Sequence, residues 1–136
     1  MTLVDSNVLL DVFTQTPDWW EWSLAQLEDA ALQGPLLIND VIFAESSIRF
    51  SRIEDFEKAL SDAGITVVPI PRAALFLAGK ASVQYRYAGG ARSGVLPDFF
   101  IGAHAAIAGI PLLTRDTRRY RTYFPIVTLI APEQGA

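Results

Sequence analysis

The chain has 136 residues, 51% of them hydrophobic and 19% charged, and its formal net charge at pH 7 is −4. This length and composition predict one well-packed domain, residues 1–136, and leave no room for a second. The net charge argues against a protein that coats nucleic acid through a broad basic face, and the absence of cysteine excludes disulfides and thiolate zinc sites.

No apolar run approaches the length of about 20 residues that a membrane-spanning helix needs. The first residues lack the basic start of a signal peptide. We therefore expect no membrane association and a cytoplasmic location, which the absence of cysteine also fits. With a single histidine in the chain, oxygen atoms remain as the plausible metal ligands, and these select hard cations such as Mg²⁺ or Mn²⁺.

Apolar runs typical of strands alternate with helical stretches along the chain. Strands are predicted near residues 2–4, 35–38, 65–68, 111–114 and 126–130. Helices are predicted at about 18–33, 40–50, 53–64, 71–85 and 97–108, with a glycine-rich loop over 87–96. This alternation predicts an α/β fold with a central parallel β-sheet of about five strands and helices on both faces.

Four carboxylates fall where such a sheet would gather them at one edge. Asp5 follows the first strand, Asp116 follows the fourth, and Asp98 begins the helix that leads back into the fourth. Glu45 lies early in the helix after the second strand. Crossover helices begin over the edge where the strands end. Acids that converge there would repel one another without a cation, so the pattern predicts a metal site.

Each of these acids also has a purely structural interpretation. Asp5 can form an Asx-turn, Asp116 can cap a short turn, and Asp98 can favour the positive end of its own helix. Glu45 is harder to explain in this way, because helical spacing places it on an apolar face that we expect to be buried, formed by Val41, Ile42, Ala44 and Ile48. A buried carboxylate is costly without a compensating partner.

Three neighbouring polar residues also have two interpretations. Asn7 can bind Asp5 or a metal-bound water, or simply form a turn. Thr114 can support the acids with its hydroxyl, or can be an ordinary β-branched strand residue. His104 lies in a helix of small and apolar residues, and we expect a partly buried histidine with a local hydrogen bond and no part in catalysis.

Residues 3–11, 96–105 and 113–116 (LVDSNVLLD, LPDFFIGAHA and LTRD) resemble PIN domains, and more narrowly the VapC-like toxins of prokaryotic type II toxin–antitoxin pairs. The resemblance extends from Thr2 to about Thr128. It implies a metal-dependent endoribonuclease that is inhibited by a cognate antitoxin protein and that forms a homodimer. The acidic quartet of the family matches Asp5, Glu45, Asp98 and Asp116, and Ser6 stands where the family often has threonine.

The implied chemistry is cleavage of RNA phosphodiester bonds with Mg²⁺ (or Mn²⁺) held by the quartet, which therefore supplies both the metal ligands and the catalytic residues. Arg115, Arg86 and Arg92 are candidates for contacts to RNA phosphates. Exposed arginines are otherwise simply solvated. Which RNA is cut does not follow from the resemblance.

Other functions of α/β proteins fit less well. A phospho-acceptor receiver domain would need an acid pair after the first strand and a late lysine, but no lysine follows Lys80. An aspartate-nucleophile phosphatase would need a second acid where Asn7 stands, and a binding module would not need Glu45 to be buried. A housekeeping RNA-processing nuclease of the same fold is the serious alternative, and a small upstream antitoxin gene would distinguish the two.

The helix predicted over 18–33 also bears on partners. One apolar face, which should pack on the sheet, contains Trp19, Trp20, Leu24, Leu27 and Ala31. Trp22 is predicted to point away from that face, toward acidic residues. Because tryptophan is a favoured interface anchor, we expect Trp22 to lie in the homodimer or antitoxin interface, with a core position as the alternative.

Overall fold

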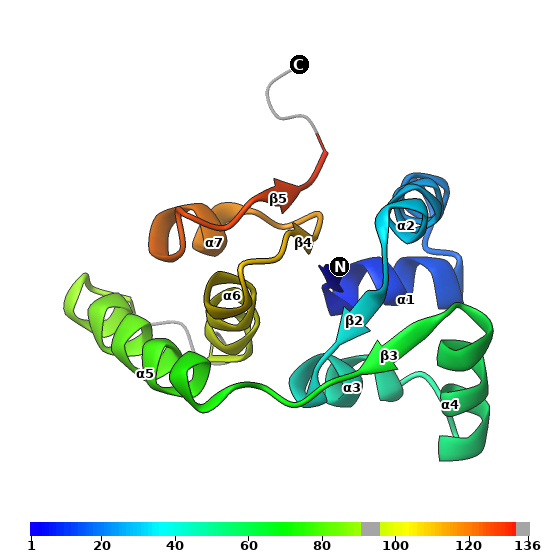
Figure 1. Cartoon of the computed structure of the whole chain (residues 1–136), viewed down its shortest axis with the longest axis horizontal. Coiled ribbons are helices and arrows are strands. Elements are labelled where there is room, and N and C mark those ends of the chain that lie inside the picture. Colours follow the sequence, from blue (N-terminus) through cyan, green and yellow to red (C-terminus); the bar gives the residue numbers. More distant parts are fainter. Residues whose placement is uncertain (91–95, 133–136) are drawn as a thin grey trace.

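The protein is described from a computed structural model, which covers residues 1–90 and 96–132. Strands and helices alternate in the order β1 (Thr2–Val4), α1 (Ser6–Thr14), α2 (Trp20–Gln33), β2 (Leu36–Ile38), α3 (Asp40–Ser47), α4 (Ile53–Asp62), β3 (Ile65–Val67), α5 (Arg72–Tyr87), α6 (Leu96–Ala108), β4 (Leu112–Leu113), α7 (Arg118–Tyr123) and β5 (Leu129–Ile130). Figure 1 shows α1 and α2 on one side of the sheet and α5 and α6 on the other.

The strands form one five-stranded sheet in the order β3-β2-β1-β4-β5, and every neighbouring pair is parallel. Leu3 in the central strand pairs with Leu37 on one side and with Leu112 on the other. The predicted α/β fold with about five parallel strands is therefore confirmed. Because both faces are covered by helices, the strands are apolar and the central ones are buried.

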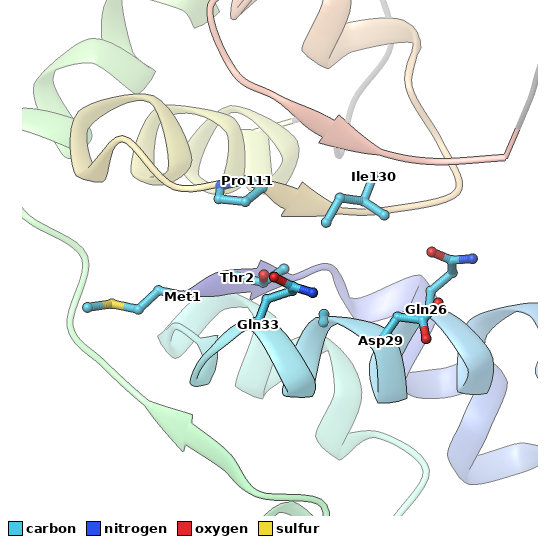
Figure 2. A pocket seen from close by; sticks show the side chains of 8 residues that line it. Met1, Thr2, Gln26, Asp29, Gln33, Pro111 and Ile130 are labelled. Carbon is cyan, nitrogen blue, oxygen red and sulfur yellow. The ribbon is translucent and has the colours of Figure 1, made fainter.

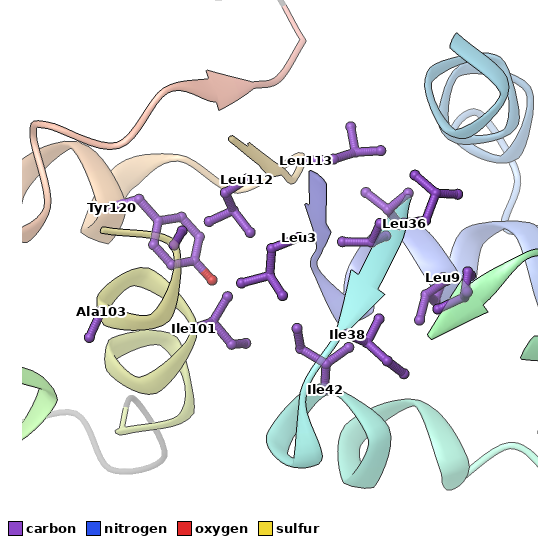
Figure 3. Packing of buried hydrophobic residues seen from close by; sticks show 14 of the residues in the cluster. Leu3, Leu9, Leu36, Ile38, Ile42, Ile101, Ala103, Leu112, Leu113 and Tyr120 are labelled. Carbon is purple, nitrogen blue, oxygen red and sulfur yellow. The ribbon is translucent and has the colours of Figure 1, made fainter. Parts of the chain in front are cut away.

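The core lies on both faces of β1 and β4, whose leucines and Val4 have no exposed surface. In Figure 3, Ile101 of α6 and Ile42 at the start of α3 approach these strands. Phe99 is also fully buried and makes aromatic contacts with Tyr85, Tyr123 and Phe124. This aromatic cluster joins α5, which precedes the glycine-rich segment, to α6 and the end of α7, which follow it.

Two helices were not predicted from the sequence. Helix α1 begins one residue after β1, and Asp5 is its N-cap. Asn7 therefore lies in the first turn of a helix, where a turn leaving the strand was expected. Helix α7 follows Asp116 and contains Arg119 and Tyr120, where only a short turn was expected. Both helices turn out to carry residues of the candidate site.

The buried face of α2 differs from the predicted one. Ser23, Leu27 and Ala30 are its buried residues, while Ala31 is exposed. Ser23 lies inside because its hydroxyl donates a 2.7 Å hydrogen bond to the buried carboxylate of Asp11 in α1. This buried polar pair places Ser23 on the inner face of α2, a position that the apolar pattern alone does not predict.

Trp22 does not point away from the protein as expected. It is half-buried and packs against the hydrophobic core, and its ring meets the Trp19 ring edge-on with centroids 5.9 Å apart. The packing therefore supports the core position for Trp22. In the described part of the chain, no helix has both the length and the apolar character that crossing a membrane would require.

Candidate active site

The order of the strands reverses its direction at β1, because β2 and β3 lie on one side of it and β4 and β5 on the other. Ligands of such sheets bind outside the carboxyl ends of the strands at this switch point. Asp5 directly follows β1, and Asp98 lies in the first turn of α6. Glu45 projects from α3, the helix after β2. Three acids from distant parts of the sequence thus belong to this one edge.

Asp5 is held in place by hydrogen bonds from several elements. Only 4% of its surface is exposed, and its Oδ1 accepts a 2.7 Å bond from the backbone N–H of Ser6, which caps α1. Its Oδ2 accepts bonds from the hydroxyls of Thr114 at 2.8 Å and Tyr120 at 2.9 Å. The two interpretations of Asp5 do not exclude each other, since the same carboxylate caps a helix and lies at the edge where the acids gather.

Glu45 is connected to Asp5 through Ser6. The Ser6 hydroxyl donates to Oε1 of Glu45 at 3.0 Å and lies 3.4 Å from Oδ1 of Asp5. The apolar environment expected around Glu45 is partly wrong, because Ala44 and Ile48 are exposed. Glu45 itself is half-buried, at the edge of α3 that faces Asp5.

The carboxylates influence one another electrostatically. Burial raises the pKa of Asp5, and the nearby charge of Asp98 adds to this, while the bonds from Thr114 and Tyr120 act in the opposite direction. Burial also raises the pKa of Glu45, with further contributions from the charges of Asp5 and Asp98. A buried position was expected for Glu45 in particular, but Asp5 is the more buried of the two.

Asp116 lies at the rim of this group, where its side chain is exposed. Thr114 connects it to the interior, because its Oγ1 accepts a 3.1 Å bond from the Asp116 N–H and donates to Asp5. Thr114 thus has the position expected of a supporting hydroxyl. For Asn7, binding to Asp5 or a metal-bound water and a simple turn were both possible. Its Nδ2 donates to Oγ1 of Thr114 and its Oδ1 accepts from the backbone N–H of Arg115, both at 3.3 Å.

The arginines proposed for phosphate contacts have different positions. Arg115 donates from Nε and Nη2 to the two carboxylate oxygens of Asp11 at 2.6 and 2.7 Å, and its guanidinium lies 5.1 Å from the Trp19 ring centroid. This bidentate pair with a buried acid fixes the position of the Arg115 side chain. Arg86 is exposed in the last turn of α5, and Arg92 lies outside the described residues.

Sequence reasoning missed two residues in contact with the acids. Arg119 forms an ion pair with Asp98, from Nη1 to Oδ2 at 2.8 Å. Tyr120 bonds Asp5, and burial, followed by the charges of Asp5 and Asp98, raises the pKa of its hydroxyl well above the ordinary value. The available signal was their position three and four residues after Asp116, which puts both on a short helix at the same edge.

The donor atoms at this edge suit a hard divalent cation in kind, because they are carboxylate oxygens that are desolvated and repel one another. Their present arrangement is not a closed cage. Within residues 1–90 and 96–132, no three acidic or histidine side chains are grouped closely enough to hold a metal ion. Hydroxyls and the Arg119 guanidinium occupy oxygens of Asp5 and Asp98. The chemistry of the donors therefore fits a metal, and these contacts would have to rearrange to admit one.

A cavity of about 480 Å³ lies at the other end of the central strands. Its walls come from α2 and from the beginnings of β1 and β4, with Gln26 and Gln33 facing Pro111 and Ile130 (Figure 2). No member of the acidic quartet lines it. The acids and this cavity are therefore separate features of the molecule.

The profile of the PIN domain matches residues 2–125. The chain belongs to the PIN-domain family. The resemblance inferred from the three acidic segments is thereby confirmed, and the quartet falls inside the matched region. His104 was expected to be partly buried with a local hydrogen bond. It is almost fully buried, and its Nδ1 lies 3.0 Å from the side-chain amide nitrogen of Asn39, which is 65 positions away in the sequence.

Several solved structures have the same fold, and one of them is a toxin–antitoxin complex from Klebsiella pneumoniae, with a TM-score of 0.64 at 20% identity and 94% and 96% covered. VapBC2 from Rickettsia felis, bound to a DNA fragment of its promoter, is similar with a TM-score of 0.71 at 16% identity, covering 97% of this chain and 98% of that one. FitAcB from Neisseria gonorrhoeae gives a TM-score of 0.66 at 18% identity, with 95% and 96% covered. DNA-bound VapBC from Salmonella typhimurium gives 0.67 at 14% identity, with 96% of each chain covered. Sequence comparison with curated proteins finds no significant match.

Proposed function

We propose that this PIN domain is a metal-dependent endoribonuclease and the toxin of a toxin–antitoxin pair. The observation that carries the proposal is the convergence of Asp5, Glu45 and Asp98 at the switch point of a PIN sheet, where the charge of Asp98 raises the pKa of both Asp5 and Glu45. Residues 1–136 would act as one catalytic domain in the cytoplasm. Structural similarity to VapBC and FitAcB supports the toxin assignment.

Asp5, Glu45, Asp98 and Asp116 are the residues that would hold Mg²⁺ or Mn²⁺. When bound, such a cation lowers the pKa of the attacking water and neutralises charge that develops on the phosphate. Thr114 and Tyr120 fix the orientation of Asp5, and Asn7 fixes that of Thr114. This network holds the buried carboxylate of Asp5 in place while no cation is bound, and its hydroxyl contacts would rearrange when a cation binds.

The substrate in this proposal is RNA, which reaches the acids along their exposed rim. Asp116 is exposed there. The exposed Arg86 in the last turn of α5, together with Arg92, would contribute contacts to RNA phosphates. Arg115 contributes by holding the loop that carries Asp116, through its pair with Asp11.

The direct test is cleavage of RNA by the purified chain with Mg²⁺ or Mn²⁺ and with chelator. Asp98→Asn should abolish cleavage while the domain remains folded by circular dichroism. Asp55→Asn is the matched control, because Asp55 also lies in the first turn of a helix but is exposed on α4. Cleavage that persists in chelator, or that survives in Asp98→Asn, would show that the acids do not act through a metal.

The partner in this proposal is a cognate antitoxin protein, and the toxin itself is a homodimer. Expression of the chain alone should arrest growth of the host cell, and co-expression of a small protein encoded directly upstream should relieve the arrest and co-purify with it. Sedimentation of the purified chain should give the mass of a dimer. If no such neighbouring gene exists and expression is harmless, the nuclease would instead be a housekeeping enzyme.

A further inference from the structure

Arg119 provides a positive charge within the acidic group itself. Its Nη1 lies 2.8 Å from Oδ2 of Asp98, and the two side chains are only 19% and 31% exposed. Arg119 comes from α7 and Asp98 from the first turn of α6. Because an arginine stays protonated at any physiological pH, this charge cannot be removed by titration.

The position of the pair matters because Asp98 interacts with the other acids. Its charge raises the pKa of Asp5 and of Glu45, so a cation on Asp98 lowers the repulsion across the whole group. Arg119 has this effect in the structure without any metal. A divalent cation bound to the same carboxylates would provide the same compensation, and Arg119 would then be a positive charge beside it.

The Arg119 pair also leaves the guanidinium incompletely bonded. Its Nε is buried and has no hydrogen-bond partner among the described residues, and its guanidinium carbon lies 6.0 Å from the Tyr85 ring centroid. The neighbouring Arg115 differs, because its Nε and Nη2 bond both oxygens of Asp11. A buried N–H without a partner weakens the net stabilisation that an ion pair gives. The pair with Asp98 is therefore the easier of the two to break.

We propose that Arg119 is a built-in competitor of the divalent cation: it holds Asp98 when the cation is absent and gives up this carboxylate when the cation binds. The inference rests on the proposed metal site and adds a residue that sets the affinity of that site. Arg119 is a positioning residue in this scheme, since it acts through Asp98. The ion pair between Arg119 and Asp98 stabilises the acidic group in the absence of metal. As a consequence, it weakens metal binding.

The test is Mn²⁺ binding to the full chain, measured by calorimetry, together with melting temperatures in chelator and in Mn²⁺. Arg119→Gln removes the charge and should lower the Kd for Mn²⁺ by about tenfold, because one repulsive charge is lost. The same variant should melt at a lower temperature than the wild type in chelator. Arg119→Lys, which keeps the charge, should bind Mn²⁺ with close to the wild-type Kd.

Arg118→Gln is the matched control, because it removes the same charge from the adjacent, exposed position. Its Kd should change by less than about twofold, since exposed charges are screened by salt. An Arg119→Gln variant that binds Mn²⁺ no more tightly than the wild type would overturn the competition and leave the metal site intact. A wild-type chain that binds no Mn²⁺ at all would overturn both this inference and the proposed nuclease mechanism.

Discussion

At the scale of single residues, Asp5 combines two functions that usually compete. As the cap of α1, Asp5 must provide an oxygen that accepts a hydrogen bond, and the ionised carboxylate does this best. Its burial, however, disfavours the ionised form. Hydrogen bonds from Thr114 and Tyr120 compensate part of the burial. The carboxylate of Asp5 is therefore fixed in position, and a bound cation would stabilise its ionised form.

This balance predicts how stability depends on pH without metal. The pKa of Asp5 is raised above its ordinary value of 3.8, so between the two values the folded state binds a proton that the unfolded state has already lost. The contribution of Asp5 to the free energy of unfolding is therefore complete below 3.8 and is lost as pH rises through the folded pKa. Glu45 should act in the same direction, because its pKa is also raised.

NMR titration of the side-chain carboxyl carbons in chelator measures both pKa values directly, and urea unfolding at several pH values measures the stability. Asp5→Asn removes one titrating group. The free energy of unfolding of this variant, relative to that of the wild type, should therefore increase as pH rises from about 4 to 7. Ordinary pKa values for Asp5 and Glu45 would mean that the carboxylates do not share a site.

At the scale of elements, the contact between α6 and α7 depends on a glycine. A Cβ atom on Gly102 would overlap the ring of Phe124, which follows α7. Gly102→Ala should therefore lower the free energy of unfolding by about 1–3 kcal/mol, as overpacking does in a filled core. Because α7 carries Arg119 and Tyr120, the displacement of its end should also weaken the hydrogen bond to Asp5.

Gly79 in α5 is the matched control for this substitution. It is also helical, but a Cβ there would meet nothing within 4 Å. Gly79→Ala should raise the free energy of unfolding by up to about 1 kcal/mol, because alanine is the better helix former. Urea unfolding of both variants checks the prediction, and equal effects of the same sign would show that the Phe124 contact does not limit the packing.

Much of the fold was predictable at this scale, because apolar strand runs and glycine or proline boundaries are local signals. Helix α1 was not predicted, since Asp5 is the only residue between β1 and α1 and the apolar Val8 and Leu9 continue the strand-like run. The prediction of the buried face of α2 was wrong because Ser23 is buried, where its hydroxyl donates a hydrogen bond to Asp11. A pattern of apolar residues cannot reveal a buried polar pair.

The acids of the candidate site were predictable for a related reason: parallel strands bring their carboxyl ends together, so residues after strands meet. The groups that hold them were not. Arg119 and Tyr120 reach Asp98 and Asp5 only because α7 folds back over α6. Arg115 was predicted to contact phosphate, and its bidentate pair with Asp11 depends on a contact between residues 104 positions apart.

At the scale of the whole molecule, metal binding should stabilise the fold. If the acids bind Mg²⁺ or Mn²⁺, the folded state gains about 2.7 kcal/mol when free metal exceeds its Kd about 100-fold. The melting temperature should rise accordingly and fall again with chelator, as scanning calorimetry can measure. Asp98→Asn should show a smaller rise than Asp55→Asn, and an equal rise in both variants would place the metal elsewhere.

The order in which the strands pair has a consequence for protein synthesis. The central strand β1 is translated first, but its neighbour β4 pairs through Leu112 and Leu113, and Asp5 receives hydrogen bonds from residues 109 and 115 positions further along. Such contacts form late, because a long loop must close before they contribute stability. A nascent chain that has not yet reached Tyr120 therefore cannot complete the acidic edge. A nuclease built in this way would stay inactive until Tyr120 has left the ribosome.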